Sequence, residues 1–187
     1  MKPLEGYDTA PVVTGEFEVL APGGYICKII NAKEDVSTTG KKMLVLAFDI
    51  EEGEHKGYYK RRFDDDTRAD KKWQGTYRQM LEGDKAAGYF KGLITTLEAS
   101  NQGFKWNWDE RKLKGLKFGG VFGEEEYEYN GEIKKTTKIK WVRSVEKVKN
   151  GEFKVPDIKK LPTNNNPYSG TPFDDMTLVS GDGDIPF

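Results

Sequence analysis

The sequence has little of the chemistry that enzymes and metal sites require, with one cysteine (Cys27) and one histidine (His55) in 187 residues. A single cysteine excludes an intramolecular disulfide, and one cysteine with one histidine excludes a zinc cluster of the usual form. The motifs GxSxG, HExxH and GxxxxGK followed by Ser or Thr are also absent from the sequence. We therefore expect no catalytic residue, no cofactor and no metal.

Long apolar stretches are missing as well. No segment approaches the ~20 apolar residues that cross a bilayer, and the first twenty residues carry charges instead of the apolar run of a signal peptide. We therefore expect a soluble, cytoplasmic protein that does not bind membranes. Only 36 % of the residues are hydrophobic, although 12 % are aromatic. Part of the chain is thus expected to lie outside any packed core.

Charge divides the chain near its C-terminal end. Residues 161–187 contain four acidic side chains and no lysine or arginine, and prolines and asparagines interrupt any periodicity. Residues 1–160 hold all 30 basic and 27 of the 31 acidic side chains, a formal charge of +3. This pattern predicts an N-terminal extension (1–20), a folded domain (21–150) and a disordered linker with an acidic tail (151–187). On charge alone, an anionic ligand for the body and a neutral protein with a polar terminus are equally favoured.

Hydrophobic periodicity predicts three strands, a helical insert and two further strands within the folded domain. Trp73, Tyr77 and Met80 are spaced like one helix face, and Asp84 is a candidate N-cap for a longer amphipathic helix that begins near Ala86. The strands are expected at 25–33, 43–50, 58–64, 116–129 and 132–145.

The last two strands form a predicted hairpin. Asn130-Gly131 is the favoured pair for a two-residue type I′ turn, and the resulting register places Glu126 opposite the oppositely charged Lys135. Three strands, a helix and two strands are the element order of the oligonucleotide/oligosaccharide-binding (OB) fold. We therefore expect a mainly β protein with a five-stranded Greek-key barrel and a helical insert between strands 3 and 4. An α+β sandwich gives the same order of elements.

Basic residues alternate with aromatic ones in three of these segments. Proteins that bind single-stranded nucleic acid use positive charge for the phosphates and aromatic faces for the bases. The hairpin register places Tyr127 opposite Lys134, and the segments are those that OB folds use for ligands. A polar outer face of a half-buried sheet is the alternative interpretation. The candidate DNA-binding residues are Lys41, Lys42, Tyr58, Lys60, Arg62, Tyr127, Tyr129, Lys134, Lys138 and Lys140.

Three further groups of residues have an open role at this stage. A basic and aromatic cluster on the insert, and Trp106 with Trp108, would either extend a DNA groove or serve as core or lid residues. Asp64–Asp66 is the one acidic cluster that would hold Mg²⁺ as in nucleases, although a solvated strand end accounts for it better. The cluster on the insert comprises Arg68, Lys71, Lys72, Trp73 and Arg78.

The sequence closes on an acidic run followed by Asp184-Ile185-Pro186-Phe187. This ending resembles the C-terminal tail of bacterial single-stranded DNA-binding proteins, whose chains join an OB domain, a polar linker and an acidic tip that ends in Phe. The body shows neither the usual N-terminal strand pattern nor a Gln/Gly-rich linker. It therefore looks like a divergent version from a bacteriophage or mobile element.

The tail also has a recognition chemistry of its own. Pro186 keeps Ile185 extended, and Phe187 offers an apolar anchor beside a free carboxylate, a group that proteins capture as a recognition mode. Asp182 and Asp184 would add attraction to a basic partner surface. The protein-recruiting residues are therefore expected to be Asp182, Asp184, Ile185, Pro186 and Phe187.

Together these features predict sequence-independent binding and protection of single-stranded DNA in replication or recombination, in the cytoplasm of a bacterial host cell. The tail would recruit replication and recombination proteins, and a homo-oligomer is left open. One alternative is a tail-mimicking interaction module without DNA affinity. A second, less favoured alternative is a metal-dependent nuclease.

Overall fold

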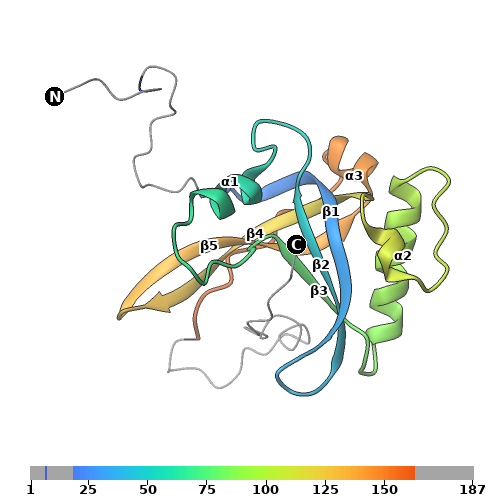
Figure 1. Cartoon of the computed structure of the whole chain (residues 1–187), viewed down its shortest axis with the longest axis horizontal. Coiled ribbons are helices and arrows are strands. Elements are labelled where there is room, and N and C mark those ends of the chain that lie inside the picture. The colour runs from blue at the N-terminus through green and yellow to red at the C-terminus, as the bar shows by residue number, and fades with distance from the viewer. Residues whose placement is uncertain (1–6, 8–18, 163–187) are drawn as a thin grey trace.

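Five strands form one antiparallel sheet in the computed structural model, which describes residue 7 and residues 19–162 (Figure 1). The helices are α1 (Tyr58–Asp65), α2 (Ala86–Ser100) and α3 (Val145–Lys149), with a 3-10 helix η1 (Glu110–Leu113). The strands are β1 (Gly23–Val36), β2 (Lys42–Ile50), β3 (Thr76–Met80), β4 (Lys117–Tyr129) and β5 (Glu132–Arg143).

The order of the strands across the sheet is β3-β2-β1-β4-β5. The first three strands follow one another by antiparallel pairing, and β4 returns to lie beside β1, which is a Greek-key connection. Among the described residues no ladder joins β3 to β5, so the sheet is open between these two strands. The structure confirms the expected mainly β fold and is consistent with a partly open OB-type barrel whose main helix, α2, lies between strands 3 and 4.

The main hydrophobic core lies between the sheet and α2. Leu93 and Leu97 of α2 belong to one buried cluster with Phe48 of β2 and with Phe118 and Phe122 of β4. Full burial of a side chain of this size contributes about 1.5–3 kcal/mol relative to exposure. The core therefore accounts for the position of α2 on the sheet. The period-two residues of the second strand, Leu44, Leu46, Phe48 and Ile50, all belong to this core, as predicted.

Residues 58–65 form helix α1, so the strand expected at 58–64 is wrong. Tyr58 and Tyr59 are both buried although they are adjacent, which a half-buried strand does not allow. The carboxylate of Asp49 in β2 accepts hydrogen bonds from the backbone N–H groups of Tyr59 (2.9 Å) and Lys60 (3.1 Å) at the start of the helix. The helix is thus stabilised by a contact from another element, which local composition could not reveal.

The third strand is instead Thr76–Met80, where the sequence favoured a helix face. Its residues pair with β2, with Tyr77 opposite Leu46, and Gln79 is buried. The indole N–H of Trp73 donates to the backbone oxygen of Phe48 (3.1 Å), which fixes the chain just before the strand. Asp84 is not the N-cap of α2 either, because Lys85 holds that position without a side-chain hydrogen bond.

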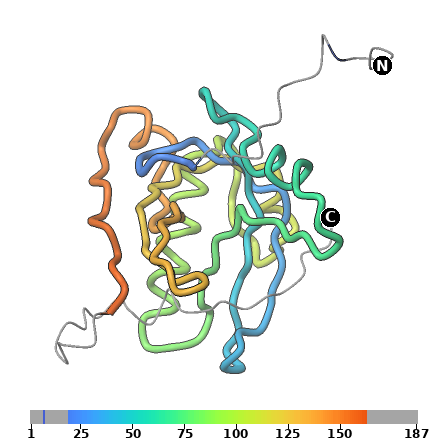
Figure 2. The backbone as a smooth tube through the Cα atoms, turned by 90° about the vertical axis from the view of Figure 1, so that its left-hand side faces the viewer, coloured from blue at the N-terminus to red at the C-terminus, as the bar shows by residue number. Residues whose placement is uncertain are grey.

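The packed domain continues past residue 150, where the sequence predicted the linker. Phe153 packs on a second, smaller cluster that contains Val121 and Val148, on the face of β1 and β4 opposite the main core. Further along, Lys159 exchanges backbone hydrogen bonds with Glu124 (3.0 Å) and Glu126 (2.9 Å) of β4. Residues 150–162 therefore run along the side of the barrel (Figure 2), within the segment that the sequence assigned mainly to the linker.

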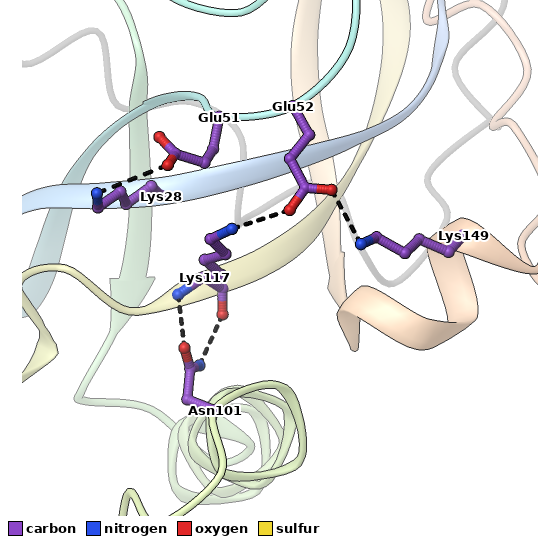
Figure 3. Close-up of polar contacts among 6 residues, drawn as sticks. All are labelled: Lys28, Glu51, Glu52, Asn101, Lys117 and Lys149. Carbon is purple, nitrogen blue, oxygen red and sulfur yellow. Dashed lines mark hydrogen bonds and ion pairs between the residues drawn. The ribbon is translucent and has the colours of Figure 1, made fainter.

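Polar contacts join residues at the ends of β2, α2, β4 and α3 (Figure 3). Glu52, just after β2, accepts hydrogen bonds from the ammonium groups of Lys117 in β4 (2.9 Å) and Lys149 in α3 (2.9 Å). The side-chain amide of Asn101, just after α2, pairs with the backbone N–H and C=O of Lys117 (2.8 Å each). We call these four residues the basal clamp, because they join β2, α2, β4 and α3.

Candidate nucleic-acid interface

Beyond the barrel, β4 and β5 continue as a two-stranded arm. The ladder between β1 and β4 ends at Phe122, whereas β4 and β5 stay paired as far as Tyr129. We call residues 124–138 the hairpin arm, and its tip lies at one extreme of the sheet (Figure 1). Asn130 and Gly131 close the arm with φ angles of 53° and 78°. Positive φ at both positions is the type I′ geometry, so the predicted turn is confirmed.

The register of the arm is also the predicted one. Tyr127 lies opposite Lys134, and Glu126 lies opposite Lys135. Because successive side chains of a strand point to opposite faces, these two pairs lie on different faces of the arm. We call the face that carries Tyr127 the tyrosine face. Its polar and aromatic residues are Glu125, Tyr127, Tyr129, Glu132, Lys134, Thr136, Lys138 and, at its base, Lys140.

Two aromatic rings are open to solvent on the tyrosine face. Tyr127 is 41 % exposed and Tyr129 is 55 % exposed. The ammonium group of Lys134 lies 4.9 Å from the centroid of the Tyr129 ring, a cation–π contact. Residues two apart on a strand are separated by roughly 7 Å, so each ring can take its own base. This arrangement combines stacking surfaces with a cation, as single-strand binders do.

A glutamate reduces the positive charge of this face. Glu125 forms ion pairs with Lys138 and with Lys140 (2.6 Å to its ammonium group). Burial alone would raise the pKa of Glu125, but the hydrogen bonds from the two lysines hold that pKa below its ordinary value. The side chain of Lys140 is only 11 % exposed. Lys140 is therefore largely buried in its ion pair with Glu125. Lys134 and Lys138 are the lysines of this face whose side chains stay exposed.

The charge balance distinguishes the two faces of the arm. The tyrosine face and its base carry three lysines against two glutamates. The opposite face carries Glu124, Glu126 and Glu128 against Lys135 alone. A polyanion is therefore attracted to the tyrosine face and repelled by the opposite one, although the attraction from the arm itself is modest.

More positive charge is found in residues 58–80, which we call the α1–β3 segment. This segment contains seven basic and four acidic side chains. Lys71 lies over the ring of Phe63, with its ammonium group 4.6 Å from the centroid, and Phe63 contacts Trp73 at 5.8 Å between ring centroids. Part of the basic cluster that the sequence indicated is therefore assembled, around aromatic rings that are half-buried.

Arg68 lies in the α1–β3 segment, in the loop that follows α1. Its guanidinium binds the Asp66 carboxylate through two nitrogens (2.7 and 2.9 Å), and the Arg68 side chain and backbone lower the pKa of Asp66 to about 2. The pKa of Arg68 is raised chiefly by this pairing with Asp66, and Tyr129 of the arm makes the smallest contribution to that shift. Arg68 lines a shallow pocket together with Arg62, Asp66 and Gln74. We take the tyrosine face and this pocket together as the candidate interface.

Four of the residues predicted to contact DNA are buried, paired with another side chain, or distant from the tip of the hairpin arm. Tyr58 is buried in the core, and its hydroxyl accepts a hydrogen bond from Arg62 (2.8 Å), so its ring offers no stacking surface. Lys60 is exposed on α1 and forms an ion pair with Asp64 (2.6 Å). Lys41 and Lys42 are exposed at the β1–β2 turn, which lies apart from the tip of the arm in both views (Figures 1 and 2).

Sequence reasoning missed Glu125 and underrated Arg68. Glu125 lies two residues before Tyr127, so the period of two already placed it on the tyrosine face. Its pairing with Lys140 depends on the register shift between Val121 and Phe122, which leaves Lys140 without a partner residue in the ladder. Arg68 was expected on a helical insert, whereas it lies in the loop between α1 and the edge strand β3.

The acidic cluster at 64–66 lies at the end of α1. Asp64 is paired with Lys60 and Asp66 with Arg68. Among residue 7 and residues 19–162, no group of three or more His, Cys, Asp or Glu side chains is arranged to hold a metal ion. In the same part of the chain, no helix has the length and apolar character to cross a membrane.

The protein-recruiting residues Asp182, Asp184, Ile185, Pro186 and Phe187 lie outside the described residues. The structure does place the start of their segment. Lys159 pairs with the free edge of β4, and the backbone N–H of Leu161 donates to the Glu126 carboxylate (3.2 Å). The chain therefore leaves the described domain beside the base of the hairpin arm.

Comparisons with known proteins identify one family. The sequence model of a family described as "Protein of unknown function (DUF669)" matches residues 6–102, which is just over half of the chain. The match includes β1 to β3 and α2 but ends before the hairpin arm. A search of curated proteins found no match.

Proposed function

The chain belongs to the DUF669 family, and we propose that it binds single-stranded DNA without sequence preference and protects it during replication or recombination. A divergent bacteriophage or mobile-element version of the bacterial single-stranded DNA-binding proteins would have this role. The observation that carries the proposal is the tyrosine face. Tyr127, Tyr129 and Lys134 lie together, exposed, on an arm of an OB-type sheet.

Tyrosines and cations bind different parts of the DNA in the proposed complex. Bases stack on Tyr127 and Tyr129, while Lys134, Lys138 and Arg68 bind phosphates. Stacking tolerates every base because each has a π face, and phosphate contacts carry no sequence information. Weak sequence preference therefore follows from the kind of residue at the site. Each phosphate that is neutralised adds about −0.7 to the slope of log affinity against log salt.

The matched pair Lys134 and Lys135 tests the proposal on the two faces of one strand. Fluorescence anisotropy of labelled single-stranded DNA is measured across a salt series for Lys134/Lys138→Ala and for Lys135→Ala. We expect the double variant to bind more weakly and its slope to fall by about 1.4, the value for two phosphates. The control should keep the wild-type affinity and slope. Equal behaviour of the two variants would refute the tyrosine face as the interface.

A second part of the proposal concerns the tail, which we infer to recruit replication and recombination proteins. The position where the chain leaves the domain supports a link between the two parts. The described residues end at 162, beside the base of the arm, and residues 163–187 carry four acidic side chains and no basic one. A basic DNA groove and an acidic tail attract each other, so the tail would compete weakly with DNA, most clearly at low salt.

Deletion of Phe187 tests the recruitment role apart from DNA binding. An anchor worth about 2 kcal/mol, within the range for burial of a Phe, corresponds to roughly 30-fold in affinity. We expect the deletion to abolish capture of partner proteins from host lysate while DNA affinity stays the same. Removal of 182–187 should leave DNA affinity unchanged or raise it at low salt. Recovery of the same partners by both proteins would refute the recruitment model.

The same measurements, together with a DNA-cleavage assay, distinguish this proposal from its two alternatives. A tail-mimicking module without DNA affinity would capture partners but give no anisotropy change with single-stranded DNA. A metal-dependent nuclease would cleave DNA when Mg²⁺ is added, and Asp66→Asn would stop the cleavage.

A further inference from the structure

α2 and the loop that follows it lie on the side of the molecule opposite the tip of the hairpin arm (Figure 1). Three of their aromatic residues form a cluster. Phe90 of α2 contacts Trp106 and Trp108 of the loop, with ring centroids 5.8 and 6.0 Å apart. The two indole rings are 6.1 Å apart. We call Phe90, Trp106 and Trp108 the tryptophan ledge.

Trp108 is held in a position that protein stability does not explain. Its side chain is 80 % exposed, and its ring lies nearly parallel to that of Phe90, at 25°. Its backbone has φ of 65°, in the left-handed region that a bulky residue rarely adopts. A large apolar side chain that is both exposed and strained contributes little to folding, and such positions are concentrated at binding sites.

The loop fixes this arrangement from both sides. The Glu98 carboxylate of α2 accepts a hydrogen bond from the backbone N–H of Trp106 (3.0 Å). The Asp109 carboxylate accepts from the backbone N–H of Arg111 (3.2 Å) at the start of η1. In addition, the indole N–H of Trp106 is buried without an acceptor among the described residues, an exception that ordered water or a ligand ordinarily explains.

Basic residues surround the ledge in the sequence. Residues 102–115 carry four basic side chains against two acidic ones. Lys105 and Arg111 are paired with acidic neighbours. Lys112 and Lys114 are exposed, and neither forms an ion pair within the described part of the chain. A planar aromatic surface, with exposed lysines four and six residues after Trp108 in the sequence, matches a ligand with flat π faces and negative charge.

We propose that the tryptophan ledge is a second stacking site for single-stranded DNA, with a base on the outer face of Trp108 and phosphates near Lys112 and Lys114. This proposal rests on the proposed function and extends it. Because the ledge and the arm lie on opposite sides of the molecule, a short strand reaches one of them only. A longer strand that passes around the barrel reaches both, so the ledge lengthens the DNA site.

The test compares two lengths of single-stranded DNA. One is about 8 nucleotides, within the ~4–16 that one OB domain covers, and the other is about four times longer. We expect Trp108→Ala to weaken binding of the long strand by about 5- to 150-fold, the range for loss of one stacked base. The short strand should bind as to wild type, because it is held by the arm. Trp108→Phe should retain most of the affinity for the long strand.

Two further variants make the outcome decisive. Trp108→Gly removes the ring and relieves the left-handed backbone, so its melting temperature should not fall. Val36→Ala removes another exposed apolar side chain and should change neither binding nor stability. A large fall in melting temperature for Trp108→Gly would make Trp108 a structural residue and overturn the proposal.

The remaining outcomes separate this inference from the proposed function. If wild type binds both lengths and Trp108→Ala binds them equally well, the ledge proposal fails and the arm proposal stands. If wild type binds neither length, both proposals fail. If sedimentation shows that Trp108→Ala converts an oligomer into a monomer, the ledge is a contact between copies of the chain, which also overturns the proposal.

Discussion

The two halves of β4 have the same backbone conformation and opposite surroundings. From Phe118 to Gly123 every residue is buried, between the main core on one face and the cluster with α3 on the other. From Glu124 to Tyr129 burial falls away, and the last three residues are exposed. The first half holds the strand in the barrel, and the second half presents side chains to solvent.

The difference follows from the side chains that each half carries. The inner half contains Gly119, Gly120 and Gly123, at which neighbouring elements approach the backbone closely. The outer half contains glutamates and tyrosines, which need no core. A ligand surface on a rigid strand is better defined than one on a loop. One strand thus provides both the support and the surface, and changes in its two halves should have separable effects.

The largest effect is expected on DNA affinity, when the two tyrosines in the outer half of β4 are substituted. Tyr127→Ala/Tyr129→Ala should lower the affinity for single-stranded DNA by at least about 30-fold, since each stacked base contributes about 1–3 kcal/mol. The slope of log affinity against log salt should not change, because no cation is removed. The free energy of unfolding should also stay the same, because both rings are exposed. Anisotropy titrations and urea unfolding measure the three quantities.

A matched control for the tyrosines is the exposed Ile133, which lies opposite Glu128 on the other face of the arm. Ile133→Ala should leave DNA affinity unchanged. An equal loss of affinity for Ile133→Ala and for the tyrosine variant would mean that the arm acts as a whole and that its two faces are not distinct.

Substitutions in the inner half of β4 should change the stability of the protein. A Cβ added at Gly119 would overlap the Val148 side chain and lie 2.9 Å from the backbone oxygen of Ser144. Gly119→Ala should therefore displace α3 and lower the free energy of unfolding by about 1–3 kcal/mol, the range for overpacking. Gly92 in α2 has open space around it, so Gly92→Ala should instead raise stability by about 0.5–1 kcal/mol. Urea denaturation of both variants would contradict this comparison if they changed stability in the same direction.

The smallest effect is expected at the basal clamp, where the inner half of β4 begins. Hydrogen bonds from Lys117 and Lys149 lower the pKa of Glu52. A carboxylate with a lowered pKa stabilises the fold above its ordinary pKa, and this stabilisation is lost as the pH falls through the lowered value. Because the ion pairs of Glu52 with Lys117 and Lys149 are partly exposed to solvent, Glu52→Gln should lower the free energy of unfolding by less than about 1 kcal/mol at neutral pH.

The pH dependence identifies the cause of that loss. Urea unfolding of wild type and Glu52→Gln should give different midpoints at neutral pH, and the difference should shrink at pH values below the usual glutamate pKa of about 4.3. Glu54→Gln, two residues away on an exposed turn, should match wild type throughout. A difference for Glu52→Gln that persists unchanged in acid would rule out the ion pairs as its origin.

The hairpin arm shows what can be predicted from local sequence. The turn at Asn130-Gly131 has a strong local preference, and its length fixes the register, so the pairing of Tyr127 with Lys134 followed without any tertiary information. Helix α2 was predictable for a similar reason, since fifteen residues give a clear apolar stripe. The core residues of β2 followed from their period of two.

The α1–β3 segment shows where local sequence fails. Tyr58–Asp65 has the composition of a strand but is a short helix that Asp49 caps from β2. Thr76–Met80 has helical spacing but becomes an edge strand because β2 offers it an unpaired edge. Short segments have weak intrinsic preferences, so contacts with distant elements outweigh them. The placement of Tyr58, Lys60 and Arg62 was therefore beyond the reach of sequence reasoning.

The sequence by itself determined the mainly β class, the hairpin with its register, helix α2 and the division into a body and an acidic end. These features depend on turn chemistry, periodicity and composition, which act between residues close together in the chain. Only the tertiary structure decided that Tyr58 is buried, that Lys140 is held by Glu125, and that the chain beyond residue 150 runs along the barrel to the arm. These outcomes depend on burial and on pairing between residues far apart in the sequence, and the chain must be folded before such contacts exist.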